Sequence, residues 1–76
     1  MENNDIVKCY EKEIELFLGT MGIFKGNRAY NTNFDKSKSN RDFIINKMIK
    51  IKAGNIDRIA LEKAVDNLLP FLCEKE

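Results

Sequence analysis

The sequence predicts a small all-α fold: one helix, a long glycine-bearing loop, and two further helices that pair as a helical hairpin. Three observations support this prediction. Apolar residues recur at helical spacing in three segments, turn-forming residues collect between the first two segments, and a Gly-Asn pair separates the second segment from the third. With 76 residues, the chain is expected to form a single small domain over 1–76.

The first helix is expected over about residues 5–18. Its apolar side chains follow the spacing i, i+4, i+8 and i+11, and they include Ile6, Tyr10, Ile14 and Phe17. Polar residues at 3–5 can cap its start, and Gly19 can provide a left-handed stop at its end.

Residues 19–39 are expected to form a loop, because three of the four glycines and a series of Asn and Ser residues lie there. A short hairpin is an alternative for part of this loop. In that hairpin 21–25 would pair with 28–30, since Gly26-Asn27 can occupy a two-residue turn. Two strands alone are only marginally stable, so an irregular loop is preferred.

The helical hairpin is expected to comprise residues 40–53 and 55–69. In the first of these segments Ile44, Met48 and Ile51 share one helical face, although the many β-branched residues there also suit a strand. In the second segment apolar residues form a broad stripe, which favours a helix packed on more than one side.

Signals for the ends of these two helices are also present. Ser39 or Asn40 is expected to cap the second helix, and Asn55 the third. Pro70 is expected to end or kink the third helix, because proline removes a hydrogen-bond donor from a helix interior.

Composition excludes several classes of function. The chain has no His, the usual general base at neutral pH and the usual nitrogen ligand of zinc. We therefore expect no catalysis, no metal, no cofactor and no small-molecule substrate. Cys9 and Cys73 are expected to remain reduced in a cytoplasmic protein, because secreted domains of this size normally carry more cysteines. No apolar run is long enough to cross a membrane.

The net charge of +1 hides an uneven distribution. Residues 1–18 carry a net charge of −3, residues 19–54 carry +6, and residues 55–76 carry −2. Cations and aromatic side chains alternate in the central segment. Its candidate anion- or nucleic-acid-binding residues are Lys25, Arg28, Tyr30, Phe34, Lys36, Lys38, Arg41 and Lys47.

Such a set is typical of single-stranded DNA or RNA binding, because cations neutralise phosphates while aromatic faces stack on unpaired bases. Two alternatives remain open. The cations can be solvated or paired with the chain's own acidic helices, or oppositely charged surfaces can meet across a homodimer.

The end of the third helix provides a second candidate surface. Leucine and valine side chains there are spaced like a coiled-coil seam, and an aromatic residue adjoins them. The candidate partner-binding residues are Leu61, Val65, Leu68, Phe71 and Leu72. The alternative is that these side chains close the core beneath the first helix.

Together these patterns favour a non-catalytic module that binds a protein and regulates or inhibits it. The alternative is a nucleic-acid-binding protein that uses residues 24–47. A core this small is marginal alone, so we expect a homodimer or a bound partner to add stability. Ile, Lys and Asn, which AT-rich codons encode, supply 28 of the 76 residues. By association, we expect a phage or mobile-element protein.

Overall fold

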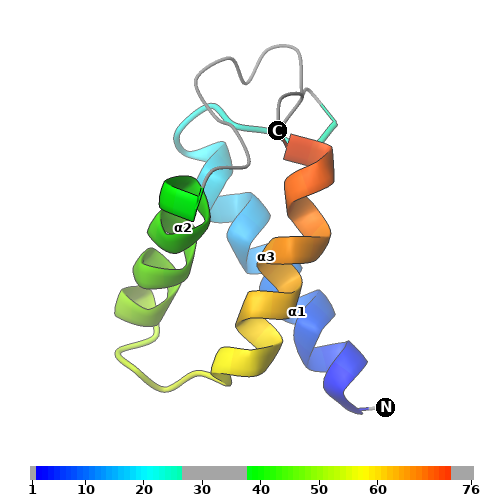
Figure 1. Cartoon of the computed structure of the whole chain (residues 1–76), viewed down its shortest axis with the longest axis vertical. Coiled ribbons are helices and arrows are strands. Elements are labelled where there is room, and N and C mark those ends of the chain that lie inside the picture. Colours follow the sequence, from blue (N-terminus) through cyan, green and yellow to red (C-terminus); the bar gives the residue numbers. More distant parts are fainter. Residues whose placement is uncertain (1, 27–37, 73–76) are drawn as a thin grey trace.

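The computed structural model describes residues 2–26 and 38–72 (Figure 1). Three α-helices occupy them: α1 (Glu2–Gly19), α2 (Lys38–Ile51) and α3 (Arg58–Leu72). The described part of the chain contains no strand, so the prediction of an all-helical chain with three helices is confirmed. Of the alternative hairpin, residues 21–25 form turns and irregular backbone, and residues 28–30 lie outside the described part.

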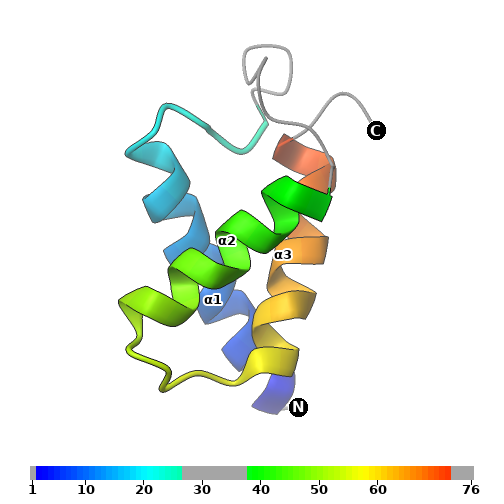
Figure 2. The ribbon, with the colours of Figure 1, turned by 60° about the vertical axis from the view of Figure 1, so that its left-hand side comes forward.

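The core is built around α3, which packs against both α1 and α2. Figures 1 and 2 show α2 and α3 running in opposite directions, as a helical hairpin, while α1 crosses α3. The buried side chains of α3 are Ala60, Leu61, Ala64, Val65, Leu68, Leu69 and Leu72. The other helices supply the remaining fully buried apolar side chains: Val7, Ile14 and Leu18 on α1, and Ile44, Ile45 and Met48 on α2.

Two aromatic residues of α1 fasten it to the other elements. The ring centroids of Phe17 and Phe43 are 6.1 Å apart, which joins α1 to α2. The hydroxyl oxygen of Tyr10 accepts a hydrogen bond of 3.0 Å from the backbone N–H of Asp57, immediately before α3. Both contacts lie at the edge of the core, where the aromatic bodies bury apolar area.

The start of α3 corrects one capping prediction. The Asp57 carboxylate accepts a hydrogen bond of 3.2 Å from the backbone N–H of Ala60, and the Asp57 carbonyl accepts the first helical bond from Leu61. Asp57 is therefore the N-cap, and the prediction that Asn55 caps this helix was wrong. Both residue types make good caps, and the position of the first helical turn decides between them.

Two other helix ends also differ from the prediction. α2 already begins at Lys38, so Ser39 and Asn40 lie inside its first turn and not at its N-cap. α3 continues through Pro70 to Leu72, although it was expected to finish at about residue 69. A proline in the last turn removes only one helical hydrogen bond, which the buried apolar stripe of α3 tolerates.

α1 ends in a Schellman motif with Gly22 at the left-handed position, φ 79°. The N–H of Ile23 donates to the carbonyl of Leu18 at 3.0 Å, and the N–H of Gly22 donates to that of Gly19 at 3.1 Å. Gly19 itself lies inside the helix, so the prediction that it forms the left-handed stop was wrong. A Cβ at Gly19 would lie 3.5 Å from the ring of Phe24, an ordinary van der Waals distance, so Phe24 lies close beside this position.

α2 ends in the same motif, but an alanine occupies the left-handed position. The N–H of Gly54 donates to the carbonyl of Ile49 at 2.9 Å, and the N–H of Ala53 donates to that of Lys50 at 3.0 Å. Ala53 adopts a φ of 55°. A side chain with a Cβ costs about 1–2 kcal/mol in this conformation, so the turn between α2 and α3 stores strain that glycine would relieve.

The two Schellman motifs predict that two substitutions change the free energy of unfolding in opposite directions. Ala53→Gly should raise the free energy of unfolding by about 0.5–1 kcal/mol, since relief of strain exceeds the added entropy of the unfolded chain. Gly22→Ala should lower it by about 1 kcal/mol, because no atom lies within 4 Å of the added methyl group and only the backbone is strained. Urea denaturation followed by circular dichroism measures both. Changes of the same sign would contradict the assignment of the two motifs.

Candidate partner-binding surface

The predicted C-terminal contact residues lie mostly inside the molecule. Leu61, Val65, Leu68 and Leu72 are at most 1% exposed, because α1 and α2 cover them from two sides. Phe71 is the exposed member of the set, at 50%. Four of the five residues therefore belong to the chain's own core, which is the alternative that the sequence left open. These four side chains are not accessible to a partner.

The predicted basic-aromatic set is described only in part. Arg28, Tyr30, Phe34 and Lys36 lie outside the described residues, and Lys38 is the first residue of α2. The other three cations each have a neighbour. Lys25 lies 3.9 Å from Glu15 and 5.2 Å from the centroid of the Phe71 ring, and the ammonium of Lys47 lies 5.9 Å from the centroid of the Phe43 ring.

Arg41 is held on the acidic side of α3. Its Nε and a terminal guanidinium nitrogen donate to the two carboxylate oxygens of Asp66 at 2.7 and 3.2 Å, and Glu62 lies 3.9 Å away. The hydrogen bond that Arg41 donates to the Asp66 carboxylate raises the pKa of Arg41 above its usual value. This bidentate pair agrees with the alternative that central cations neutralise the chain's own acidic helices.

Three glutamates of α1 are likewise engaged with other elements. Glu13 accepts a hydrogen bond from Lys52 and lies 2.9 Å from its ammonium, and this bond raises the pKa of Lys52. Glu11 accepts a hydrogen bond of 3.0 Å from the side-chain amide of Asn67, and Glu15 pairs with Lys25. Three of the five acidic side chains in residues 1–18 are therefore directed toward the rest of the molecule.

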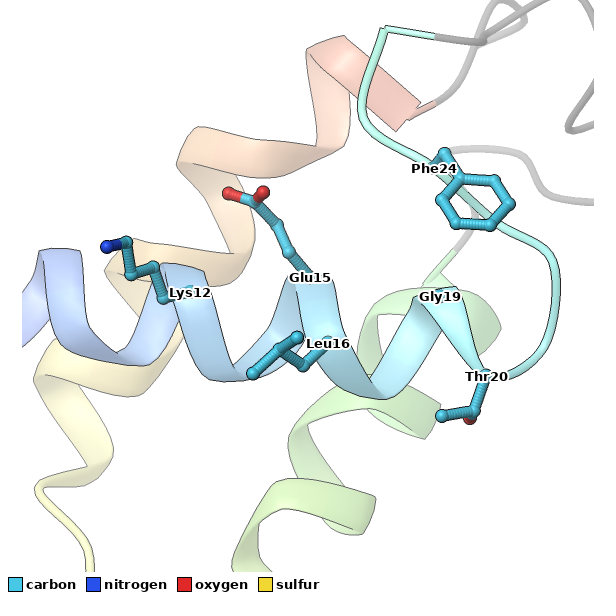
Figure 3. A pocket seen from close by; sticks show the side chains of 6 residues that line it. All are labelled: Lys12, Glu15, Leu16, Gly19, Thr20 and Phe24. Carbon is cyan, nitrogen blue, oxygen red and sulfur yellow. The ribbon is translucent and has the colours of Figure 1, made fainter.

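Exposed apolar side chains gather at the C-terminal end of α1. Leu16 is 73% exposed and Phe24 50% exposed, and they line a shallow hollow of about 690 Å³ (Figure 3). The complete lining is Lys12, Glu15, Leu16, Gly19, Thr20 and Phe24. Gly19 contributes no side chain, which leaves the space between the leucine and the ring open.

The backbone after α1 places Phe24 beside the helix. The Schellman motif reverses the chain at Gly22, and the N–H of Gly26 donates a hydrogen bond of 2.8 Å to the carbonyl of Phe71. Residues 20–26 thus form a strap from α1 to the last turn of α3. The hydroxyl of Thr20 donates to the Phe17 carbonyl at 2.6 Å, so its hydrogen is already used within the strap.

Sequence reasoning missed Leu16 and treated Phe24 only as part of the basic segment. The available signal for Leu16 was its position off the periodic apolar face of α1, where a large aliphatic side chain must point to solvent. Phe24 offered no such signal, because its place beside Gly19 depends on the path of the strap.

Another exposed apolar side chain, Ile59, lies far from this hollow along the chain, on the first turn of α3. Ile59 is 81% exposed and borders a smaller hollow of about 160 Å³ with Val7, Asp57, Ala60 and Lys63. A single exposed isoleucine is ordinary for a soluble protein, so this site serves best as a control.

In residues 2–26 and 38–72 no three His, Cys, Asp or Glu side chains are grouped to hold a metal ion, and Cys9 is an exposed free thiol. None of the helices described has both the length and the apolar character to span a bilayer.

The chain matches no family model, no curated protein and no solved structure.

The Arg41–Asp66 pair predicts a measurable coupling energy. A double-mutant cycle with Arg41→Ala and Asp66→Ala should give about 0.5–1 kcal/mol at low salt, because the pair is bidentate yet partly exposed. The coupling should fall as salt is added. Arg58 and Glu62, one turn apart within α3 at 3.0 Å, provide the comparison and should couple more weakly. Equal coupling energies in the two cycles would show that the bidentate geometry does not strengthen the ion pair.

Proposed function

We propose that the chain is a small non-catalytic binding module that regulates or inhibits the protein it contacts, and that its contact surface is the hollow between Leu16 and Phe24. The observation that supports this most is the exposure of these two large apolar side chains at one place. Clustered exposed apolar groups mark contact sites far better than scattered ones do.

The form of the hollow favours a protein partner over a small molecule. Small-molecule sites usually bury most of the ligand surface, whereas Leu16 at 73% exposure lines only an open depression. A large side chain from another protein would bury both walls, and its own chain would cover the surroundings, as in the central anchor of many interfaces.

The groups around the hollow support a non-catalytic role. Its polar lining consists of Lys12, Glu15 and Thr20. Glu15 pairs with Lys25, and the Thr20 hydroxyl donates to a backbone carbonyl. Nucleophilic catalysis needs a nucleophile hydrogen-bonded to a base that is itself oriented, and this lining contains no such arrangement.

The proposal predicts that Leu16→Ser with Phe24→Ser abolishes capture of a protein partner. Both side chains are at least half exposed, so the free energy of unfolding should change by only about 0.5 kcal/mol. Quantitative pull-downs with the full chain, from nuclease-treated extract of the source cells, measure the loss.

Ile59→Ser is the matched control, because Ile59 is even more exposed and lies on α3. It should capture the same proteins as the unmodified chain. If the double variant and the control capture the same proteins equally, the hollow is not the contact surface.

The expected homodimer is a related proposal. A second copy is the rival occupant of the same hollow, and it would add the burial that a small core lacks. Light scattering over a concentration series measures the mass, and Leu16→Ser with Phe24→Ser should shift it to that of the monomer. A monomer at every concentration would contradict the expectation.

Nucleic-acid binding is the second candidate, and one observation favours it. Lys47 and Lys50 lie three residues apart on exposed positions of α2, and neither has an ion-pair partner among the described residues. Phe43 adjoins Lys47 and could stack on a base.

This alternative predicts binding of single-stranded RNA or DNA that weakens steeply with salt. Lys47→Gln with Lys50→Gln should reduce the slope of log K against log salt by about 1.4, since each phosphate contact contributes about 0.7. Asp66→Asn should strengthen binding by releasing Arg41 from its carboxylate partner. Fluorescence anisotropy with labelled oligonucleotides measures both effects, and no binding at low salt would exclude the alternative.

A further inference from the structure

The hollow continues into a longer strip along α1. Lys8, Lys12 and Leu16 follow one another at intervals of four residues, so they share one face of the helix, and all three are exposed. In Figure 3 the ammonium of Lys12 points toward the N-terminal half of α1, away from Phe24. We call this set of side chains the basic strip: Lys8, Lys12, Leu16 and Phe24.

The charge of this strip is opposite to that of the helix as a whole. Residues 1–18 carry a net charge of −3, yet Glu11, Glu13 and Glu15 contact Asn67, Lys52 and Lys25 respectively. Neither lysine of the strip has an ion-pair partner among the described residues.

Asp5 is the exposed acidic residue nearest to the strip along the helix, and it lies N-terminal to both lysines. The outward face therefore presents two cations followed by an apolar hollow.

We propose that the basic strip binds an acidic amphipathic helix of another protein. Carboxylates one turn apart on that helix pair with Lys8 and Lys12, and a large apolar side chain about one turn further on enters the hollow between Leu16 and Phe24. Helices have the same rise per residue, so charges spaced by four residues on both partners stay in register. This inference rests on the proposed function and adds the chemistry of the partner.

Charge complementarity favours this occupant over a second copy of the chain. The acidic pair of α3 with the required spacing, Glu62 and Asp66, is already paired with Arg41 and Arg58. The pair on α1, Glu11 and Glu15, contacts Asn67 and Lys25. Among the described residues, a second copy therefore offers the strip no acidic pair of this spacing that is free.

The number of cations favours a protein over a membrane or a nucleic acid. Electrostatic attachment to anionic lipid typically uses clusters of about 4–8 basic residues, and the strip has Lys8 and Lys12. Two phosphate contacts would likewise give only weak binding to a nucleic acid. Two ion pairs at the rim of an apolar anchor, in contrast, are an ordinary arrangement for a protein interface.

The test is selection of a displayed library of helical peptides, with randomised surface positions, on the full chain. Selected peptides should be enriched in Asp and Glu one turn apart, followed by an aromatic or large aliphatic residue about one turn later. Their affinities, measured by fluorescence anisotropy, should fall about tenfold for Lys8→Gln with Lys12→Gln, the effect of two rim ion pairs. The charge-reversed variant, Lys8→Glu with Lys12→Glu, should select basic peptides in place of acidic ones.

Lys47→Gln with Lys50→Gln is the control for the first variant, because it removes two exposed cations from α2, and it should leave affinity unchanged. Circular dichroism checks that each variant is folded, and the neutral glutamine variant carries the test if the reversed one is not.

Each other outcome has a distinct meaning. Peptides that need Leu16 and Phe24 but show no acidic enrichment overturn this inference and leave the proposed function standing. Peptides unaffected by Leu16→Ser with Phe24→Ser overturn both. The inference is also overturned if no peptide is selected, if vesicles containing phosphatidylserine displace the selected peptides, or if Lys8→Gln with Lys12→Gln dissociates a dimer.

Discussion

The burial of α3 is the constraint on which the rest of this structure depends. Its apolar stripe, Ala60 to Leu72, is too broad for one neighbouring helix, so α1 and α2 both have to pack against it. That requirement places α1 with one face in the core and the opposite face in water. It also explains why the seam-like spacing of α3 marks a core position: a stripe covered on two sides cannot also be presented to a partner.

Ion pairing follows from the same packing. Because α3 packs against both other helices, its acidic side chains reach the guanidinium of Arg41 on α2. On α1, three glutamates reach other elements: Glu11 contacts Asn67, Glu13 contacts Lys52 and Glu15 contacts Lys25. Charges that are separated in the sequence are thereby matched in space. The surface that results differs from the segment charges: α1 is acidic by count and basic along its exposed strip.

Periodicity was sufficient to predict the three helices and most of each buried face, because burial of an apolar stripe dominates these choices. Ile51 is an exception: it was expected on the apolar face of α2 with Ile44 and Met48, but it is the last residue of that helix and is 59% exposed. Features that depend on the exact position of a turn could not be predicted. Asp57 and Asn55 are chemically similar caps, and Gly19 and Gly22 are both plausible stops, so only the folded geometry separates them. The hollow was unpredictable for the same reason, since a turn brings Phe24 back against α1.

The strap that forms this hollow is tied to α3 by the hydrogen bond from Gly26 to Phe71. Pro70 lies in the same helical turn and provides no N–H, so that turn has one internal bond fewer than the rest of α3. Opening of the last turn and loss of the hollow are therefore coupled events. Binding of a partner in the hollow should therefore slow the hydrogen exchange of the Gly26 amide. The exchange rate of this one amide would then report whether the hollow is occupied.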